Sequence, residues 1–567
     1  MGIAVIYRVR IFITNAGVCL SMTDRDRMFG YSSFAVGQKV VWVVQRQTSS
    51  FLQEQDGLRV SDRGASSRLS LIAILSIFLI SLLPLAVTPI IPTIDFYNHV
   101  ARYYVLTHLD QHIALRENYA LAWKLLPNLG LDVLAMPVFH MLPPLAAAKA
   151  IIIMIFAVQY GGVLALSRAL NGRVTLVTAL LASILLYSYI FVWGFANFLL
   201  GNGLSFWCLA LWLKLRERNL WLASLVCSIF AGIIFLCHGF AFALYGIMLS
   251  MLEFGRWRLS RPRKISGLLW PAVAVAVQAV VPAILFRMTP TAQAGQSAEA
   301  ILANHDAPGS LFSRLMEIGL YQLNAILRVA DSSWLLLDAL SLIFILGVGV
   351  WAMRMRTIRI EPVAIPLVIV AALLCVVTPP SLFGVGKIAE RIPLLCAMLV
   401  AAAVGIGANW REGKGRSILI AALALIFLVR VGTNMIGFMG YNDDYKDFSA
   451  VMQKAPSSAV IGPASPPETR DRITNGRRCE MYPPLVVPLF GHPAPLFANP
   501  TQQPLALRGE LAELTGRAKL VSTSHDDPLA ASQPGFRYYL ACDYPTGQIA
   551  GFSTLARAGR FMLLEKQ

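Results

Sequence analysis

Long apolar runs separated by short polar connections dominate the middle of this chain. From Leu69 to Phe438, most of these runs approach the roughly 20 residues that a helix needs to cross a bilayer. Run length therefore predicts about eleven transmembrane helices. Their approximate bounds are 69–91, 146–167, 174–192, 195–213, 219–236, 239–253, 267–286, 334–353, 362–378, 392–410 and 417–438.

The segment before these runs, residues 1–68, is poorly patterned. Its one longer apolar stretch, from Ile3 to Leu20, contains Arg8 and Arg10, which make it a poor membrane span. No small-residue cleavage site follows a clean apolar core, which argues against a cleaved signal peptide. We interpret the segment as a cytoplasmic N-terminal extension, with an internal methionine such as Met28 as an alternative start.

The segment after the runs, residues 439–567, is long enough to form a small domain. Predicted helices at Asp443–Lys454 and Ala506–Ala518 alternate with three strand-like runs, AVIGP, LVVPLF and RYYLACDY. This pattern indicates a small α/β fold. The predicted fold class is therefore an all-α polytopic membrane protein, 69–438, followed by a small C-terminal α/β domain.

The membrane region includes a long first loop, residues 92–145. Its stretch from Tyr119 to Pro144 is apolar but interrupted by several prolines and a glycine. We interpret this stretch as interfacial or re-entrant pieces of the loop and not as a further span.

Composition supports a membrane protein and argues against an ordinary soluble enzyme. Hydrophobic residues make up 56% of the chain and the mean hydropathy is +0.62. Charged residues make up 14%, against roughly 25% in typical globular domains. The formal net charge is +17, but much of the excess lies in short connections between apolar runs. The predicted partner is therefore the lipid bilayer, and no nucleic acid is expected.

Lysine and arginine occupy alternate connections, which predicts the orientation. The turns at Ser188–Gly194 and Cys237–Gly239 have neither residue. By the positive-inside rule, the first loop, the loops at 287–333 and 379–391, and the tail face outward. We expect a multi-pass protein of a bacterial inner membrane, with its N-terminus in the cytoplasm and its C-terminal domain extracytoplasmic. The cytoplasmic connections carry Arg168, Arg173, Lys214, Arg216, Arg218, Arg256, Arg258, Arg261, Arg263, Lys264, Arg354, Arg356, Arg359, Arg411, Lys414 and Arg416.

Three polar side chains lie close together at the start of the first loop, in the stretch PTIDFYNHVARYY. His99 and Arg102 follow Asp95 by four and seven positions, which a helix turning ~100° per residue brings into one narrow arc. Such groups are costly to desolvate at a membrane edge. We therefore interpret Asp95 as a catalytic or substrate-positioning acid, with His99 as a second catalytic candidate and Arg102 as a substrate-binding candidate. The alternative is a polar interfacial helix.

Further polar residues gather on the predicted outward side. The asparagines could form interhelical hydrogen bonds, the histidine could end a helix, and the charges could lie at the surface or form structural ion pairs. The glycines Gly194, Gly201 and Gly203 favour close helix packing. The candidates for substrate binding are Asn197, His238, Lys387, Arg391 and Arg430.

The sequence assigns no metal or other cofactor. Asp95 and His99 have the i, i+4 spacing of two metal ligands, but no clear third ligand accompanies them, so a divalent metal is the less favoured alternative. The eight cysteines form no metal-binding pattern. Only Cys479 and Cys542 share the tail, where they could form a disulfide if the tail is extracytoplasmic.

The outward acid after the first span, the long first loop, the roughly ten spans and the outward tail together resemble GT-C-type glycosyltransferases. That superfamily includes dolichyl-phosphate-mannose protein mannosyltransferases and bacterial lipid A aminoarabinose transferases. The resemblance covers about Leu69 to Phe438 and its only residue match is the acid. Where such families often have Asp-Glu, this chain has Asp95-Phe96, and Glu117 or Asp132 are the nearby acids that could replace the missing carboxylate.

The resemblance implies transfer of a sugar from a polyprenyl phosphate to an unknown extracytoplasmic acceptor. Asp95 would then be a general base for the acceptor. Lys387, Arg391 and Arg430 would stabilise the departing phosphate. Two alternatives come from other classes of protein: a transporter or flippase of a lipid-linked or anionic substrate, and a non-catalytic membrane scaffold. The clustering of charges at the outer edge, without an internal repeat, favours the enzyme over the transporter.

Overall fold

The computed structural model describes residues 10–14, 17–21, 70–289, 311–332, 334–382, 385–464, 479–498, 500–521, 535–543 and 551–567. The chain divides into two compact units, Met1–Ser70 and Leu71–Gln567. The first unit contains an antiparallel hairpin of β1 (Arg10–Thr14) and β2 (Gly17–Ser21), in the stretch whose arginines make it a poor span. Most of the predicted extension lies outside the described residues.

The second unit confirms the predicted class of polytopic helical membrane protein. Within the described residues, seven helices are long and apolar enough to cross a bilayer. Other predicted spans form shorter helices: the span at 392–410, for example, corresponds to α19 (Arg391–Ala403). The count of eleven is therefore not established. The seven are Pro144–Asn171, Leu176–Trp193, Ala196–Arg216, Leu220–Cys237, Ser266–Arg287, Leu335–Arg354 and Lys414–Met452.

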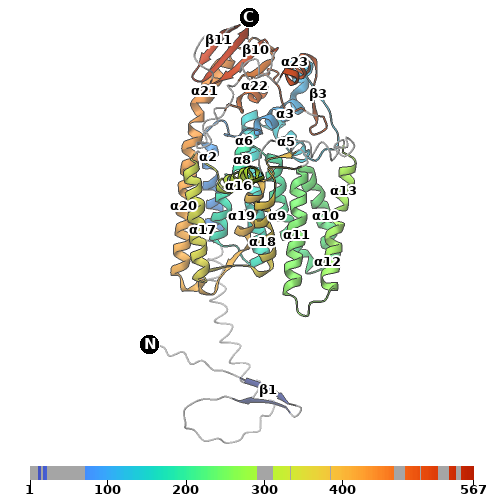
Figure 1. Cartoon of the computed structure of the whole chain (residues 1–567), viewed down its shortest axis with the longest axis vertical. Coiled ribbons are helices and arrows are strands. Elements are labelled where there is room, and N and C mark those ends of the chain that lie inside the picture. Colours follow the sequence, from blue (N-terminus) through green and yellow to red (C-terminus); the bar gives the residue numbers. More distant parts are fainter. Residues whose placement is uncertain are drawn as a thin grey trace. The chain divides into compact units, whose positions relative to one another are not determined.

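The apolar helices follow the chain in the expected order (Figure 1). An apolar helix, Ser70–Ser81, comes before them. The helices of the bundle that follow it are α2 (Leu83–Ala86), α6 (Pro144–Asn171), α7 (Leu176–Ile184), α8 (Tyr189–Trp193), α9 (Ala196–Arg216), α10 (Leu220–Cys237), α11 (Gly239–Leu259), α12 (Ser266–Val277), α13 (Val280–Arg287), α16 (Leu311–Leu327), α17 (Leu335–Arg354), α18 (Ile365–Val377), α19 and α20 (Lys414–Met439).

Close packing of α6 on α9 forms the centre of this bundle. A Cβ atom at Gly203 of α9 would lie 2.9 Å from the backbone nitrogen of Gln159 on α6, so only glycine allows this approach. The packing role predicted for this glycine is confirmed. Ser205 and Phe206, in the next turn of α9, are fully buried.

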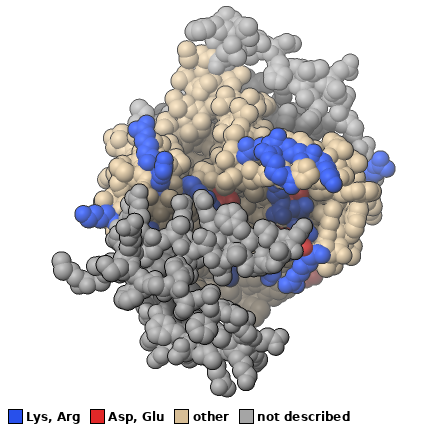
Figure 2. Space-filling view, turned by 90° about the horizontal axis from the view of Figure 1, so that it is seen from below, with Lys and Arg blue, Asp and Glu red and all other residues tan. Residues whose placement is uncertain are grey.

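The predicted cytoplasmic connections lie at one end of the bundle. The α9–α10 and α11–α12 connections are at the lower ends of these helices in Figure 1. Figure 2, a view from below, shows lysine and arginine side chains gathered on that face. Nearby, β4 (Ile358–Ile360) pairs with β7 (Val404–Ile406) in an antiparallel ladder.

The first loop and the tail meet at the opposite end (Figure 1). The loop contains α3 (Phe96–His108), α4 (Ile113–Asn118), β3 (Tyr119–Leu121) and α5 (Gly130–Met141). Strand β3 pairs antiparallel with β9 (Leu505–Leu507) of the tail. α22 (Tyr482–Phe490) packs on α3. The loop and tail are therefore one structure and not two independent lobes.

The tail is a small α/β fold, as predicted. Its four-stranded sheet has the order β11-β12-β10-β8, in which β8 and β10 are parallel and the other neighbours are antiparallel. The predicted strands AVIGP and RYYLACDY and both predicted helices are present. The elements are α21 (Tyr441–Met452), β8 (Ile461–Ala464), α22, α23 (Gly509–Val521), β10 (Tyr538–Cys542), β11 (Phe552–Ala558) and β12 (Phe561–Lys566).

The prediction of a strand at LVVPLF is wrong, because this run lies in α22. Two prolines, Pro483 and Pro484, fall in the first turn, where a missing N–H costs nothing and a φ near −65° suits a helix. Val486 and Val487 are both fully buried. A short apolar run that is buried all round looks the same in a strand and in a helix, so periodicity could not separate them.

Candidate active site

Asp95 is fixed in place by the end of α8, although it belongs to the first loop. The backbone N–H of Ile94 donates to the carbonyl of Val192 at 2.9 Å, and that of Asp95 donates to the carbonyl of Trp193 at 3.0 Å. Gly194 follows with φ +81°, and a Cβ atom there would collide with the backbone nitrogen of Phe96. The glycine therefore serves both a left-handed turn and a close approach.

The carboxylate of Asp95 is partly buried and, within the described residues, makes no hydrogen bond or ion pair of its own. Burial raises its pKa to about 6, while the charge of Lys387 lowers the pKa and that of Glu480 raises it. The structure thus brings together an acid of the first loop, a lysine of the 379–391 loop and a glutamate of the tail. These three come from distant parts of the chain.

Lys387 contacts Trp193, the residue whose carbonyl accepts a hydrogen bond from the backbone N–H of Asp95. Its Nζ atom lies 3.7 Å from the centroid of the Trp193 ring and 3.6 Å from Oε1 of Glu390. Glu390 is buried and also accepts a hydrogen bond from the hydroxyl of Tyr321. A cation over the face of a tryptophan is stabilised by the electron-rich ring. The ammonium group is therefore held at the end of α8, on the side of Asp95.

Arg391 is a buried guanidinium with no carboxylate at ion-pairing distance in the described part of the chain. It is 5% exposed, and its Nε atom has no hydrogen-bond partner. Its guanidinium carbon lies over the rings of Phe195 and Phe198, 4.6 and 5.2 Å from their centroids. The other buried arginines, Arg102, Arg328 and Arg430, each contact an aspartate. Arg391 alone among these four has aromatic faces in place of an anion.

His238 caps this arginine. Its Nε2 atom lies 3.0 Å from Nη1 of Arg391, and its Nδ1 atom lies 3.2 Å from the backbone N–H of Phe240. Both neighbours are donors, whereas a neutral imidazole has one acceptor nitrogen. Protonation of His238 would leave it no acceptor at all. A neutral His238 therefore accepts from one of these two donors, the backbone N–H of Phe240 or the guanidinium of Arg391, depending on which ring nitrogen carries the proton.

His99 and Arg102 lie together, and no hydrogen bond or ion pair among the described residues joins either of them to the Asp95 carboxylate. Arg102 is fully buried; its Nε donates to Oδ1 of Asp132 at 2.6 Å and its Nη1 donates to Oε1 of Gln503 at 2.9 Å. Nη2 lies 2.8 Å from Nδ1 of His99. Burial lowers the pKa of His99, and the charge of Arg102 lowers it further. This group ties α3 to α5 and to the tail, because each guanidinium nitrogen has a partner.

Arg430 and Asn197 also have structural partners. Arg430 lies on α20 and donates to Oδ1 of Asp338 on α17 at 2.9 Å. Oδ1 of Asn197 accepts from the backbone N–H of Leu131 at 3.3 Å, at the start of α5. No hydrogen bond or ion pair of the described residues joins either side chain to Asp95, Lys387 or Arg391. The substrate-binding roles predicted for both stay untested predictions.

No family model matches the chain, and no curated protein matches it. Among solved structures, the chain is similar to ArnT from Cupriavidus metallidurans. The crystal structure of its apo state is 14% identical with a TM-score of 0.48, and the match covers 88% of this chain and 98% of that chain. The structure of the same protein bound to undecaprenyl phosphate is 13% identical with a TM-score of 0.47, over 88% and 98% of the two chains.

The charge of Glu480 in the tail also acts on Asp95, and no sequence pattern singled it out. It precedes α22, and the packing of α22 on α3 brings it near the start of the first loop. The only signal in the sequence is its position next to Cys479. No local pattern predicts which loop a tail acid will approach.

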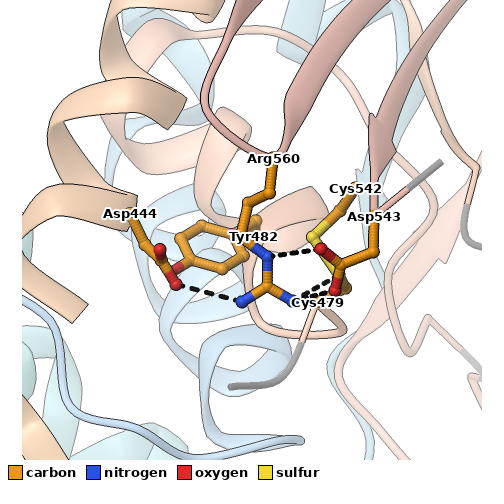
Figure 3. The surroundings of a disulfide bond; sticks show 6 residues. All are labelled: Asp444, Cys479, Tyr482, Cys542, Asp543 and Arg560. Atoms are coloured by element: carbon orange, nitrogen blue, oxygen red, sulfur yellow. Dashed lines mark hydrogen bonds and ion pairs between the residues drawn. A yellow bond between two sulfur atoms is a disulfide. The ribbon is translucent and has the colours of Figure 1, made fainter. Parts of the chain in front are cut away.

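The described residues contain one group of potential metal ligands. Its members are Cys479, Cys542 and Asp543, whose potential ligand atoms lie within 4.8 Å of one another (Figure 3). Its two cysteines are joined in a disulfide, so they offer no thiolate. Asp95 and His99 are not part of such a group.

Proposed function

We propose that this protein is a membrane glycosyltransferase that moves a sugar from a polyprenyl phosphate to an extracytoplasmic acceptor. The observation that carries the proposal is a set of three charged groups. Arg391 is buried and has no carboxylate at ion-pairing distance among the described residues, Lys387 precedes it by four positions, and the charge of Lys387 acts on the partly buried carboxylate of Asp95. The two cations suit the phosphate of a donor, and the carboxylate suits the reacting group of an acceptor.

An anionic ligand would complete the surroundings of Arg391. Moving an unpaired charge into a protein interior is unfavourable, and aromatic faces offset only part of that cost. A guanidinium fork binds a phosphate through two parallel hydrogen bonds, and its unpartnered Nε faces no competing acceptor. Lys387, four residues earlier, would add a second positive charge. A lipid phosphate can bind to both cations with its phosphate group while its lipid tail remains between the membrane helices.

Asp95 is suited to take a proton from the acceptor. With a pKa of about 6, it is mostly ionised at neutral pH and still basic enough to accept a proton in the transition state. The acceptor oxygen or nitrogen would form a bond to the anomeric carbon while its proton passes to Asp95. The bond from that carbon to the phosphate oxygen would break, and its electron pair would leave with the phosphate. Lys387 and Arg391 would stabilise the charge that develops there.

The orientation of the site is consistent with lipid-linked donors. The tail carries the Cys479–Cys542 disulfide, a bond typical of oxidising compartments outside the cytoplasm. The basic connections are at the other end of the bundle. We therefore infer a multi-pass protein of a bacterial inner membrane whose site opens on the extracytoplasmic side.

The proposal is tested with purified protein in lipid nanodiscs. A panel of undecaprenyl-phosphate-linked hexoses, pentoses and amino sugars serves as donor, and release of undecaprenyl phosphate is measured with a cell-envelope extract as acceptor. We expect release by the wild type, rising as the pH increases through about 6, because Asp95 must be ionised to act as a base. Asp95→Asn should lower the rate by roughly 100-fold or more.

The matched control is Asp110→Asn, which removes an exposed carboxylate of the same loop. It should leave the rate unchanged. Wild-type activity in Asp95→Asn would remove Asp95 from the mechanism. Movement of the intact donor across the bilayer, without release of the lipid phosphate, would instead support the transporter alternative.

A further inference from the structure

We propose that Glu390, together with Tyr321 of α16, is a positioning residue of the glycosyl-transfer site, and that it holds the ammonium group of Lys387 where the departing phosphate needs it. The inference rests on the proposed function, because the position of this ammonium group matters to the rate only where Lys387 stabilises a leaving group. It extends that function by giving a carboxylate on the cationic side of the site a part in the reaction.

The backbone at Lys387 is fixed in an unusual conformation. Lys387 has φ +56°, in the left-handed region that a residue with a Cβ atom adopts only at a cost. The next residue is anchored, because the N–H of Ile388 donates to the carbonyl of Pro380 at 3.0 Å and its side chain is buried. Backbone strain of this kind is concentrated at functional sites. A lysine in a position that would suit a glycine indicates that its side chain is needed there.

Two contacts hold the ammonium group at the end of this side chain. Its Nζ atom lies 3.6 Å from Oε1 of Glu390 and 3.7 Å from the centroid of the Trp193 ring. The backbone carbonyl of Trp193 accepts the N–H of Asp95. An opposite charge and an electron-rich ring both attract an ammonium group. Together they hold it beside the segment that carries the proposed base.

Glu390 is a buried carboxylate whose two oxygen atoms are used differently. Its Oε1 atom faces Lys387 and also accepts a hydrogen bond from the hydroxyl of Tyr321. Its Oε2 atom is buried and has no hydrogen-bond partner among the described residues. A buried acceptor without a partner is unfavourable for stability. The charge is therefore not explained by stability alone, and Tyr321 determines which oxygen atom faces the lysine.

Two structural roles for this carboxylate do not agree with its contacts. Glu390 occupies the N-cap position of α19, where side chains often accept from the first turn, but it makes no capping hydrogen bond. The adjacent Arg391 lies over aromatic rings and has no carboxylate at ion-pairing distance in the described part of the chain. Glu390 is directed instead to Tyr321 and Lys387, which leaves Arg391 to an incoming anion.

Tyr321 is in turn held by the packing of α16 on α17 and α18. The neighbouring Gln322 is buried, and its Nε2 donates to the carbonyl of Thr378, at the end of α18. Two successive residues of α16 thus contact the region around the 379–391 loop. Tyr321 and Glu390 are 69 positions apart, so no local pattern links them.

This arrangement is suited to the step in which the phosphate departs. Negative charge grows on the phosphate as its bond to the anomeric carbon breaks, and a cation that is already aligned stabilises that charge without reorganisation. Glu390 is itself an anion and does not attract a phosphate, so its contribution comes through the alignment of Lys387. Its loss should therefore lower kcat more than it weakens donor binding.

The test measures kcat and KM of the full-length chain in nanodiscs, with an undecaprenyl-phosphate-linked sugar that the wild type uses. Glu390→Gln should lower kcat roughly tenfold and leave KM within about threefold of the wild type, because the lysine remains but loses its alignment. Tyr321→Phe should lower kcat by a smaller factor. The matched control is Glu361→Gln, which removes the carboxylate 3.3 Å from Arg359 at the opposite end of the bundle and should change neither constant.

A double-mutant cycle tests whether Glu390 acts through Lys387. Lys387→Ala should lower kcat, and adding Glu390→Gln to it should produce little further loss. Additive losses in the double variant would overturn the inference, and so would a raised KM with an unchanged kcat in Glu390→Gln. Should Glu390→Gln fail to fold, Tyr321→Phe, which keeps the carboxylate, decides the matter through the same cycle.

A second measurement does not depend on turnover. An amine-reactive ester labels lysines, and mass spectrometry compares the Lys387 peptide with that of the exposed Lys446 in the same sample. Relative labelling of Lys387 should rise several-fold in Glu390→Gln, because the carboxylate no longer holds its ammonium group. Unchanged labelling together with an unchanged kcat would overturn the inference and leave the proposed function intact. Increased labelling in a protein that releases no lipid phosphate would reject the proposed function and, with it, the part of Glu390 in transfer.

Discussion

The arginine side chains of the buried interior are not equivalent. Arg102 and Arg430 each have an aspartate within 3 Å, and such pairs compensate the loss of water around both charges. Arg391 has a neutral histidine and aromatic rings. Structural stability alone does not explain why a buried charge is kept without a carboxylate at ion-pairing distance in the described part of the chain. A ligand that brings its own negative charge does explain it.

The first prediction at this scale concerns donor binding. Arg391→Ala should weaken the binding of undecaprenyl phosphate by roughly 10- to 100-fold, the contribution of a charge-assisted hydrogen bond of about 1.5–3 kcal/mol. Arg391→Lys should recover only part of the affinity because an ammonium group lacks the planar fork. Displacement of radiolabelled undecaprenyl phosphate from nanodiscs measures both.

The control for this prediction is Arg359→Ala, which removes an exposed arginine in the ladder at the opposite end of the bundle. It should bind the lipid as the wild type does. Equal affinity in Arg391→Ala and the wild type would count against a phosphate at this position.

At the scale of elements, the α8–α9 turn determines where the reactive carboxylate lies. Two backbone hydrogen bonds hold residues 94 and 95 against the end of α8, and the chain crosses so closely that only a glycine fits at position 194. Lys387 contacts the ring of Trp193 in the same turn. The turn therefore positions both the carboxylate of Asp95 and the ammonium group of Lys387.

Gly194→Ala tests this positioning. The new Cβ would meet the backbone of Phe96, so the segment carrying Asp95 must shift. We expect a lower melting temperature, from a cost of about 1–3 kcal/mol, together with loss of most transfer activity. Gly172→Ala is the matched control, because Gly172 has a similar φ of +74° but open space around it. It should lose stability through backbone strain and keep its activity; loss of activity in both would argue against a specific role for the turn.

The elements themselves were largely predictable from local pattern. Apolar runs such as 146–167 and 417–438 became α6 and α20, because a segment in lipid must satisfy its backbone hydrogen bonds internally and a helix does so. The tail helix at Asp443–Lys454 was found from its amphipathic pattern. The pairing of β3 with β9 was not predictable, since each strand has three residues and their partners are far apart in the chain.

At the scale of the whole molecule, the basic side chains and the disulfide bear on the proposed orientation. Basic side chains gather on one face, and the disulfide lies in the tail at the other end. The positive-inside rule and the oxidising environment required by a stable disulfide are independent arguments. Both support the proposed orientation, in which the first loop and the tail lie outside the cytoplasm.

Cysteine labelling in intact cells tests this orientation. Thr501→Cys introduces an exposed thiol in the tail, and Ser260→Cys introduces one in the basic α11–α12 connection. A membrane-impermeant maleimide should modify the first at once and the second only after permeabilisation, measured over the background of the parent chain. The reverse pattern would overturn the orientation and, with it, an extracytoplasmic reaction.

The sequence by itself determined that this chain is a helical membrane protein with an α/β tail, because span length, loop charge and strand alternation are properties of neighbouring residues. It also pointed to Asp95, Lys387 and Arg391. Only the tertiary structure decided which charges are paired. The partners of Arg102, Arg430 and Arg391 lie 30, 92 and 153 positions away. The tail meets the first loop only because α22 packs on α3 and β9 pairs with β3. Electrostatic interactions act through space, so the identity of an unpaired charge emerges only once the chain has folded.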